Sequence, residues 1–240
     1  MRLILAALLL LQAAPAQTEA DKVEAAIKKM TDREYRMIVS GREIGTMTLK
    51  NRVETEGGRR IAVFESVLKM TRAGEPQEEL MIEKANLDGL QFLSRRLVRL
   101  GGVVDKVMEV KDGKIALKKI DGATKQVEVT KVTVSEGALY RLPCVQEQKV
   151  GAALKIDVLD FDLQKGYELK CVERKEVELG DAKHDAFIWR LSGENTIELP
   201  SGHMKMKFEY IYWVTPEGLL LRYSMATGDE KDQNVLELKK

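Results

Sequence analysis

The sequence predicts a mainly β protein, in which one long antiparallel sheet is accompanied by an N-terminal amphipathic helix and a short helical crossover. Apolar and polar residues alternate with a period of two over most of the chain after Arg33, which is typical of strands with one buried and one solvated face. Tight-turn dipeptides separate these runs. No helical pattern recurs between the runs, as the crossovers of a parallel sheet would require.

The first segment, residues 1–16, has the layout of a secretory signal peptide. Arg2 gives a positive start, Leu3–Leu11 is an unbroken apolar run, and Ala14-Pro15-Ala16 is a small-residue cleavage signal before Gln17. The apolar run is shorter than the ~20 residues that a membrane-spanning helix needs. We therefore expect an exported protein, periplasmic or secreted, that has no integral membrane segment after cleavage.

The chain after this leader, residues 17–240, is expected to form a single β domain with a neutral charge balance. The whole sequence has 39 basic and 38 acidic residues, and the leader holds one of the basic residues, Arg2, and no acidic one. Binding to nucleic-acid phosphates requires a basic surplus. We therefore expect no nucleic-acid partner.

Residues 18–30 form the clearest predicted helix. Val23, Ile27 and Met30 recur at helical spacing, and Thr18 with Asp21 resembles a capping box. Amphipathic helices usually cover their own core, so we expect this apolar stripe to pack over a sheet or into the mouth of a barrel. A helix that binds a partner is the alternative.

The strands are predicted between dipeptides that supply the positive φ angles of tight hairpin turns. These dipeptides are Ser40-Gly41, Gly57-Gly58, Asp88-Gly89, Asp112-Gly113 and Asp121-Gly122. The predicted strands of the first half are Tyr35–Val39, the overlapping runs Glu43–Lys50 and Met47–Thr55, and then Arg60–Thr71, Glu79–Leu87, Leu90–Leu100, Val103–Val110, Lys114–Ile120 and Lys125–Val134. Those of the second half are Leu154–Phe161, Tyr167–Leu179, His184–Leu191, His203–Val214, Leu219–Met225 and Asn234–Leu238. Between the halves, residues 135–150 are expected to cross over, with a short helix at Glu136–Leu142 that Pro143 ends.

One face of the C-terminal strands is rich in methionine and aromatic residues, and we expect it to point to the concave side, under the first helix. Such side chains suit a surface that accepts varied apolar shapes, such as a lipid or another hydrophobic small molecule. The alternative is that they fill the core, which is the default for an apolar strand face. The candidate residues are Phe187, Trp189, Met204, Met206, Phe208, Tyr210, Tyr212, Leu221 and Tyr223.

Residues that could carry chemistry are few. Cys144 and Cys171 could form a disulfide in an oxidising compartment, or remain as two buried thiols. His184 and His203 flank predicted turns and have no metal-ligand spacing with the cysteines. Because no phosphate loop, nucleophile elbow or zinc helix occurs, we expect neither an enzyme nor a cofactor or metal.

The layout resembles exported bacterial all-β proteins of unknown function whose fold is akin to the outer-membrane lipoprotein carriers LolA and LolB. The resemblance lies in an aromatic strand closing on Gly-x-x-Ile-Gly at Tyr35–Gly45, in Tyr167 with Val177–Gly180, and in a Tyr-Trp-Val strand that turns at Gly into an arginine-bearing strand at Tyr212–Arg222. It implies a long antiparallel sheet curled into an open half-barrel around helices. In the carriers the concave face holds acyl chains.

The sequence therefore predicts an exported, non-enzymatic half-barrel that binds a lipid or another hydrophobic ligand on its concave face. The alternative is a structural or interaction protein of the cell envelope, with a filled core and a protein partner.

Overall fold

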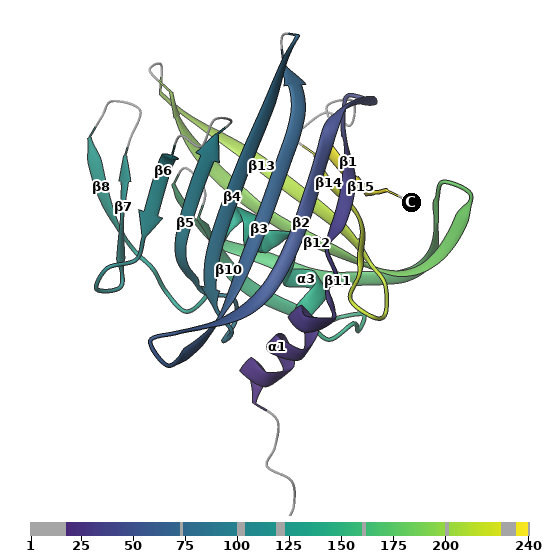
Figure 1. The fold of residues 1–240 in the computed structure, drawn as a ribbon, viewed down its shortest axis with the longest axis horizontal. Helices are drawn as coiled ribbons and strands as arrows, with labels where there is room; N and C mark the ends of the chain where they lie inside the picture. The colour runs from purple at the N-terminus through teal and green to yellow at the C-terminus, as the bar shows by residue number, and fades with distance from the viewer. Residues whose placement is uncertain are drawn as a thin grey trace, which may run out of the picture.

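The computed structural model describes residues 18–72, 74–99, 104–118, 123–159, 162–199, 202–226 and 234–239. The predicted signal peptide, residues 1–16, lies outside these ranges, and so does the predicted turn Asp121-Gly122. The described chain is mainly β, with one long sheet and few helices, as the sequence predicts (Figure 1).

The N-terminal helix α1 (Glu19–Lys29) begins and ends as predicted. Thr18 is its N-cap, and the reciprocal hydrogen bonds between Thr18 and Asp21 form a complete capping box. Met30 is the C-cap. The apolar stripe of the helix is buried in the core, with Val23 2% and Ile27 0% exposed.

The first half of the chain forms an antiparallel meander of six strands. Hairpins join consecutive strands, and Gly57 and Gly58 adopt φ angles of 54° and 77° in the turn after the second strand, which glycine accommodates without a Cβ clash. The strands are β1 (Arg33–Val39), β2 (Arg42–Glu56), β3 (Arg59–Arg72), β4 (Glu75–Asn86), β5 (Phe92–Arg99) and β6 (Val104–Glu109).

The second half returns along the other side of the molecule and joins the first through the C-terminal strand. Its strands are β9 (Thr133–Ser135), β10 (Ala153–Leu159), β11 (Leu163–Leu179), β12 (Ala182–Leu199), β13 (Gly202–Val214), β14 (Leu220–Ala226) and β15 (Asn234–Leu238). Strand β15 lies between β14 and β1, so that Tyr35 is paired with Leu238. The result is one sheet of 13 strands in the order β6-β5-β4-β3-β2-β1-β15-β14-β13-β12-β11-β10-β9.

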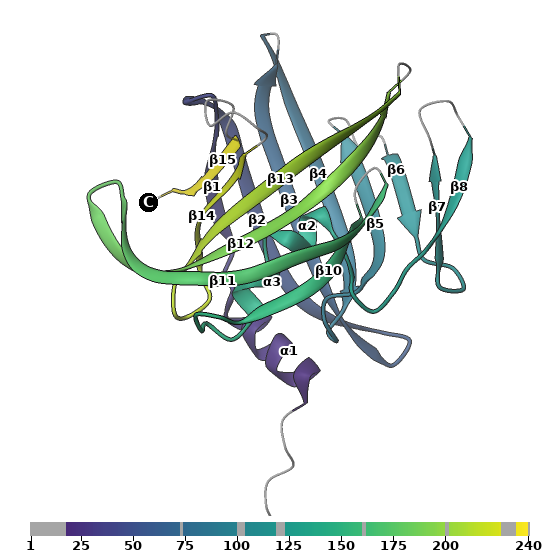
Figure 2. The same ribbon diagram turned by 180° about the vertical axis from the view of Figure 1, so that it is seen from behind.

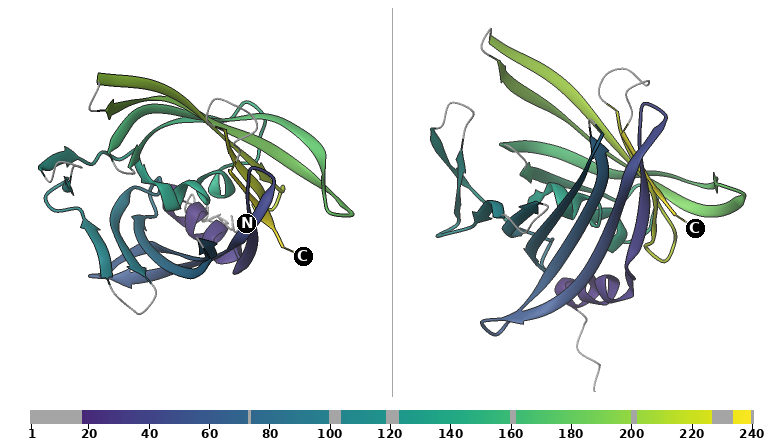
Figure 3. Two further views of the ribbon diagram at one scale, coloured as in Figure 1. Left: turned by 90° about the horizontal axis from the view of Figure 1, so that it is seen from above. Right: turned by 45° about the horizontal axis from the view of Figure 1, so that its top comes forward.

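This sheet curls around the helices without closing. Its edge strands, β6 and β9, do not pair with each other among the described residues. The view from above in Figure 3 shows the helices inside the curve, and Figure 2 shows β11, β12 and β13 crossing the opposite wall. Two short helices, α2 (Glu136–Leu139) and α3 (Leu142–Val145), lie inside the curve, while α1 covers one end and packs on β2 and α3.

Three details of the predicted meander are wrong. Asp112-Gly113 makes the predicted hairpin turn, closed by an antiparallel bridge between Lys111 and Lys114. The pairing of the flanking strands ends there, because β7 (Lys114–Lys118) pairs with β8 (Thr124–Glu128) in a separate two-stranded sheet. The predicted strand Lys125–Val134 is two strands, because a turn closed by hydrogen bonds between Thr130 and Thr133 separates β8 from β9. The sheet is also not wholly antiparallel, since β9 and β10 are parallel.

The parallel pair is possible because the crossover passes through the two short helices before the chain returns to the edge of the sheet. The predicted role of Pro143 is wrong here. It lies in the first turn of α3 rather than ending a helix, a position where its missing N–H has no helical partner to lose.

The main core lies between the inner face of the sheet and the three helices. A buried polar network fastens the crossover to the sheet within this core. Glu83, 1% exposed, accepts hydrogen bonds from Arg95 Nε at 2.5 Å and from Ser135 Oγ at 2.7 Å. Ser135 is also the N-cap of α2. A Cβ atom at Gly137 would lie 2.0 Å from the Glu83 carboxylate, so a larger residue there would have to displace that hydrogen-bonded carboxylate.

Candidate functional site

Four of the predicted binding residues are deep in the main core. Phe187, Trp189, Tyr212 and Tyr223 are each 8% exposed or less and belong to one cluster with the helices. The Trp189 indole N–H donates to Gln148 Oε1 at 3.0 Å, so its polar end is satisfied by the crossover. These four side chains therefore face the concave side, as predicted, but the covering element against β13 is α3, with α1 beyond it, rather than α1 alone.

The other predicted residues divide into three groups. Phe208 and Tyr210 are half-buried, and the Tyr210 ring stacks on Tyr223 with centroids 6.0 Å apart. The side chains of Met204 and Met206 lie outside the described part of the structure. Leu221 is buried, but in a separate cluster with Ile188 and Trp213.

The predicted facing of Leu221 is therefore wrong. The pairing of β13 with β14 shifts by one residue, from Trp213–Arg222 to Val214–Leu220, so Leu221 is an extra residue in a bulge. The bulge reverses the alternation, and Leu220 occupies the inner face in place of Leu221.

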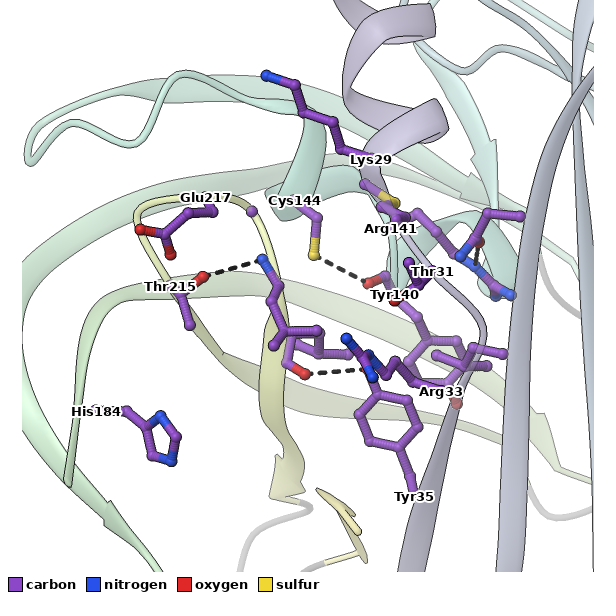
Figure 4. Close-up of a pocket in the computed structure, with 16 residues that line it drawn as sticks. Lys29, Thr31, Arg33, Tyr35, Tyr140, Arg141, Cys144, His184, Thr215 and Glu217 are labelled. Carbon is purple, nitrogen blue, oxygen red and sulfur yellow. Dashed lines mark hydrogen bonds between the residues drawn. The ribbon is translucent and has the colours of Figure 1, made fainter. Parts of the chain in front are cut away.

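A cavity of about 460 Å³ lies at the end of the half-barrel that α1 covers (Figure 4). Residues far apart in the sequence meet there: the end of α1, the starts of β1 and β12, the turn between α2 and α3, and the loop between β13 and β14. None of the predicted binding residues whose side chains the structure describes lines it. The lining residues are Lys29, Met30, Thr31, Arg33, Tyr35, Leu49, Asn51, Tyr140, Arg141, Cys144, His184, Thr215, Glu217, Gly218, Leu219 and Leu220.

The floor of the cavity is buried and largely apolar. Leu49 and Leu220 are each 4% exposed or less, and Tyr35 is 2% exposed. The Tyr35 hydroxyl donates to the Leu220 carbonyl oxygen at 3.0 Å, which ties β1 to β14 across the cavity. Burial raises the pKa of Tyr35, so the phenol remains a neutral hydrogen-bond donor.

Arg141 is the one charged residue in this floor, and it is held entirely by uncharged acceptors. Its side chain is 2% exposed and lies over the Phe64 ring, with the guanidinium carbon 5.1 Å from the centroid. Burial lowers its pKa to about 10, so it is still a cation at neutral pH. The five hydrogen bonds of its guanidinium reach Asn51 Oδ1, Ser66 Oγ and the carbonyl oxygens of Gly137, Lys50 and Glu65 at 2.8–3.4 Å.

The rim of the cavity is charged and exposed. Lys29, Arg33 and Glu217 are exposed, and His184 is half-buried. Within the described residues, none of these four side chains forms an ion pair or a side-chain hydrogen bond. Figure 4 shows Arg33 on the same side as Tyr35 and Arg141, with His184 and Glu217 across the cavity. The cavity therefore combines a buried apolar floor with a rim of unpaired charges.

The loop between β13 and β14 forms one wall, and its shape follows from its sequence. Gly218 adopts a φ angle of 86°, and a Cβ atom there would lie 2.6 Å from the Cys144 carbonyl oxygen. The Thr215 hydroxyl accepts a hydrogen bond from the Leu219 N–H at 3.2 Å, which closes the turn. Glycine thus allows the loop to lie directly against α3.

In the structure Cys144 and Cys171 are two free, buried thiols. Cys144 lines the cavity, where its thiol lies 3.7 Å from the Tyr140 carbonyl oxygen. Burial raises the pKa of Cys144 to about 12 and also raises that of Cys171.

The described residues include no group of three or more His, Cys, Asp or Glu side chains that could hold a metal ion. His184 lines the cavity on its own, while the side chain of His203 lies outside the described part. In that same part, the helices all fall short of the length and apolar character required to cross a bilayer.

Sequence reasoning missed the cavity and Arg141. Arg141 does leave a trace in the sequence, because it is the lone charged residue within the otherwise apolar run Ala138–Val145. A charge inside an apolar segment indicates a buried and fully hydrogen-bonded group. The rim residues leave no such trace, since charged side chains next to a helix end or a turn are usually solvated.

Comparison with known proteins defines the class of fold. No protein-family model matches the chain, and no curated protein matches it. Among solved structures, the chain is similar to a beta-barrel-like protein of the domain of unknown function DUF1849 from Brucella abortus, with a TM-score of 0.50 and 12% identity over 87% of this chain and 95% of that one. At that identity the similarity concerns the fold, which is a β-barrel-like sheet.

Two further structures are similar at a TM-score of 0.38. One is described as an exported protein with a YmcC-like fold from Bacteroides fragilis, at 11% identity over 87% of this chain and 95% of that one. The other is described as a lipoprotein from Parabacteroides distasonis, at 8% identity over 88% and 95%.

Proposed function

We propose that this protein is an exported, non-catalytic binding protein that holds a hydrophobic or amphiphilic ligand, such as a lipid, in the cavity at the α1 end of the half-barrel. The observation that carries the proposal is the cavity itself. Its volume of about 460 Å³ falls within the ~300–1,000 Å³ usual for small-molecule sites. Its floor is buried and apolar and its rim is exposed and charged, which is the arrangement that an amphiphile requires.

The cavity also has a stable frame. Tyr35 hydrogen-bonds across it to Leu220, and the turn that carries Gly218 rests against Cys144. A pre-formed site avoids much of the entropy cost of ordering loops when a ligand binds. The end of α1, with Lys29 and the C-cap residue Met30, supplies part of the wall and so acts as a fixed cover at this end.

The setting outside the cytoplasm is part of the same proposal. It is supported by the signal-peptide layout of residues 1–16. The resemblance to the lipoprotein carriers LolA and LolB rests on the sequence motifs alone, since the comparisons with known proteins do not show it. It motivates a role in lipid binding, but the cavity lies at one end of the half-barrel rather than along the predicted Met- and aromatic-rich face.

A titration with N-phenyl-1-naphthylamine, a neutral dye whose fluorescence rises in apolar surroundings, tests the proposal. Saturable binding with one dye per chain is expected. The variant Met30→Trp, which enlarges a half-buried side chain that lines the cavity, should weaken binding at least fivefold. Met37→Trp is the matched control, because Met37 is also half-buried but does not line the cavity.

The second candidate is an envelope interaction protein with a filled core. It is favoured by the burial of Phe187, Trp189, Tyr212 and Tyr223, which leaves no open concavity at those positions. The titration separates the two functions. Absence of saturable dye binding, or equal binding by wild type and Met30→Trp, would contradict the binding protein and leave the interaction protein.

A further inference from the structure

We infer that the cavity selects amphiphiles with an anionic head group, and that Arg33 at the rim binds this group, assisted by Lys29 and His184. The inference rests on the proposed function, since it names the class of ligand that the same cavity takes. It is carried by the placement of unpaired cations around an apolar floor.

The charges that face the cavity have a positive sum. Lys29, Arg33 and Arg141 are cations, and Glu217 is the one carboxylate among the described residues that line the cavity. Other exposed cations of this end of the molecule do have carboxylate partners, as Arg60 has in Asp21 and Glu24. The rim cations have no such partner within the described residues.

Of the three cations Lys29, Arg33 and Arg141, only Arg33 makes no contact within the described residues that stabilises the fold. Lys29 lies in the last turn of α1, where a cation also offsets the negative end of the helix dipole. All five hydrogen bonds of Arg141 are used within the protein. Arg33 is exposed and unpaired, and a free guanidinium matches carboxylate and phosphate groups with two parallel hydrogen bonds.

The buried floor of the cavity also favours an anionic ligand. Arg141 is a buried cation whose direct partners are neutral, and a charge within a low-dielectric floor projects its potential into the cavity that it lines. An acyl or other apolar chain would lie against Leu49 and Leu220, and its acidic head would lie at the rim beside Arg33. Glu217, across the cavity, would disfavour an anion on its own side.

A competition experiment tests the choice of head group. Dodecanoate, dodecyl phosphate, dodecanol and dodecyltrimethylammonium share one chain length and compete with bound N-phenyl-1-naphthylamine, which is uncharged. We expect the two anions to displace the dye at concentrations about tenfold lower than dodecanol, with the cation weakest, and the advantage of the anions to shrink at 1 M salt. The ratio of dodecanoate to dodecyl phosphate tells whether a carboxylate or a phosphate head is preferred.

The variant Arg33→Gln assigns the effect to a residue. It should lose about tenfold in affinity for the anions, the equivalent of one charged hydrogen-bonding contact, while the affinities for the dye and for dodecanol fall by a much smaller factor. Arg59→Gln is the matched control, because Arg59 is also an exposed arginine at the first position of a strand and does not line the cavity.

The outcomes separate this inference from the proposed function. If the dye binds and all four head groups compete equally, or if Arg33→Gln keeps the preference for anions, the inference is overturned while the binding function stands. If the dye does not bind at all, the proposed function fails and the inference fails with it.

Discussion

Replacing Arg141 tests whether the hydrogen bonds of its buried guanidinium stabilise the folded protein. Arg141→Met removes the guanidinium but keeps a side chain of similar length. The change leaves five acceptors without their donor, among them the Asn51 amide oxygen and the Ser66 hydroxyl. We expect a large loss of stability, because a buried polar group without its hydrogen bond costs about 1–3 kcal/mol.

The magnitude follows from two opposing effects. Five charge-assisted hydrogen bonds at about 1.5 kcal/mol each favour the native arginine. Its burial, which lowers the pKa from 12.5 to about 10, opposes folding by roughly 3 kcal/mol. The net loss for Arg141→Met should therefore be about 4 kcal/mol.

Urea unfolding followed by tryptophan fluorescence measures this loss, since Trp189 is fully buried. With an m-value of about 2.5 kcal/mol/M, the midpoint should fall by about 1.6 M. Arg52→Met is the control, because Arg52 is 43% exposed and its ion pairs with Glu54 and Glu65 are worth about 1 kcal/mol at most.

The variant Arg141→Lys keeps the charge but has three donors and no planar fork, so its stability should fall between that of wild type and Arg141→Met. The reasoning is refuted if Arg141→Met and Arg52→Met unfold at the same urea concentration, or if Arg141→Lys is as stable as wild type.

Three further predictions concern other parts of the structure. Tyr212→Phe should raise the free energy of unfolding in urea by about 1 kcal/mol, because the buried Tyr212 hydroxyl has no hydrogen-bond partner among the described residues. Tyr35→Phe should lower it by about 1–2 kcal/mol, because the Tyr35 hydroxyl loses its hydrogen bond to the Leu220 carbonyl oxygen. The opposite order of stabilities would contradict these hydrogen-bond assignments. Cys144 and Cys171 should resist a disulfide-exchange reagent at pH 8 in the folded protein, and two thiols per chain should react in urea; a count of zero would indicate a disulfide. The pKa of Asp21 is lowered to about 2, first by its hydrogen bond with Thr18, so the contribution of this carboxylate to stability is present above pH 4 and lost as the pH falls to 2. In Asp21→Asn the urea midpoint should therefore decline less steeply between pH 4 and pH 2 than in the wild type. The same decline in both proteins would contradict this role of Asp21.

Local chemistry made the elements predictable. Thr18 and Asp21 define the start of α1 through contacts three residues apart, and the helix therefore forms where the sequence places it. The glycine-containing turns specify where strands reverse, because few other residues adopt positive φ. The period of two then shows which side chains share a face, and it correctly turns Trp189 and Tyr212 towards the concave side.

The candidate site could not be predicted in the same way, because it exists only where distant segments meet. The cavity joins the end of α1 to β1, the crossover, the start of β12 and the β13–β14 loop. The bulge at Leu221 reverses one strand face through a one-residue shift that alternation alone does not reveal. The sequence pointed to an apolar strand face, and the crossover helices cover much of that face.

The sequence by itself determined that this chain is a β protein with a capped N-terminal helix and hairpin turns, because those features depend on residues a few positions apart. Tertiary structure alone decided that β15 pairs with β1, that β9 and β10 run parallel, and that Arg141 is buried. Strand pairing and burial depend on which surfaces the complete sheet brings together, and the alternation of a strand is the same whichever neighbour it acquires.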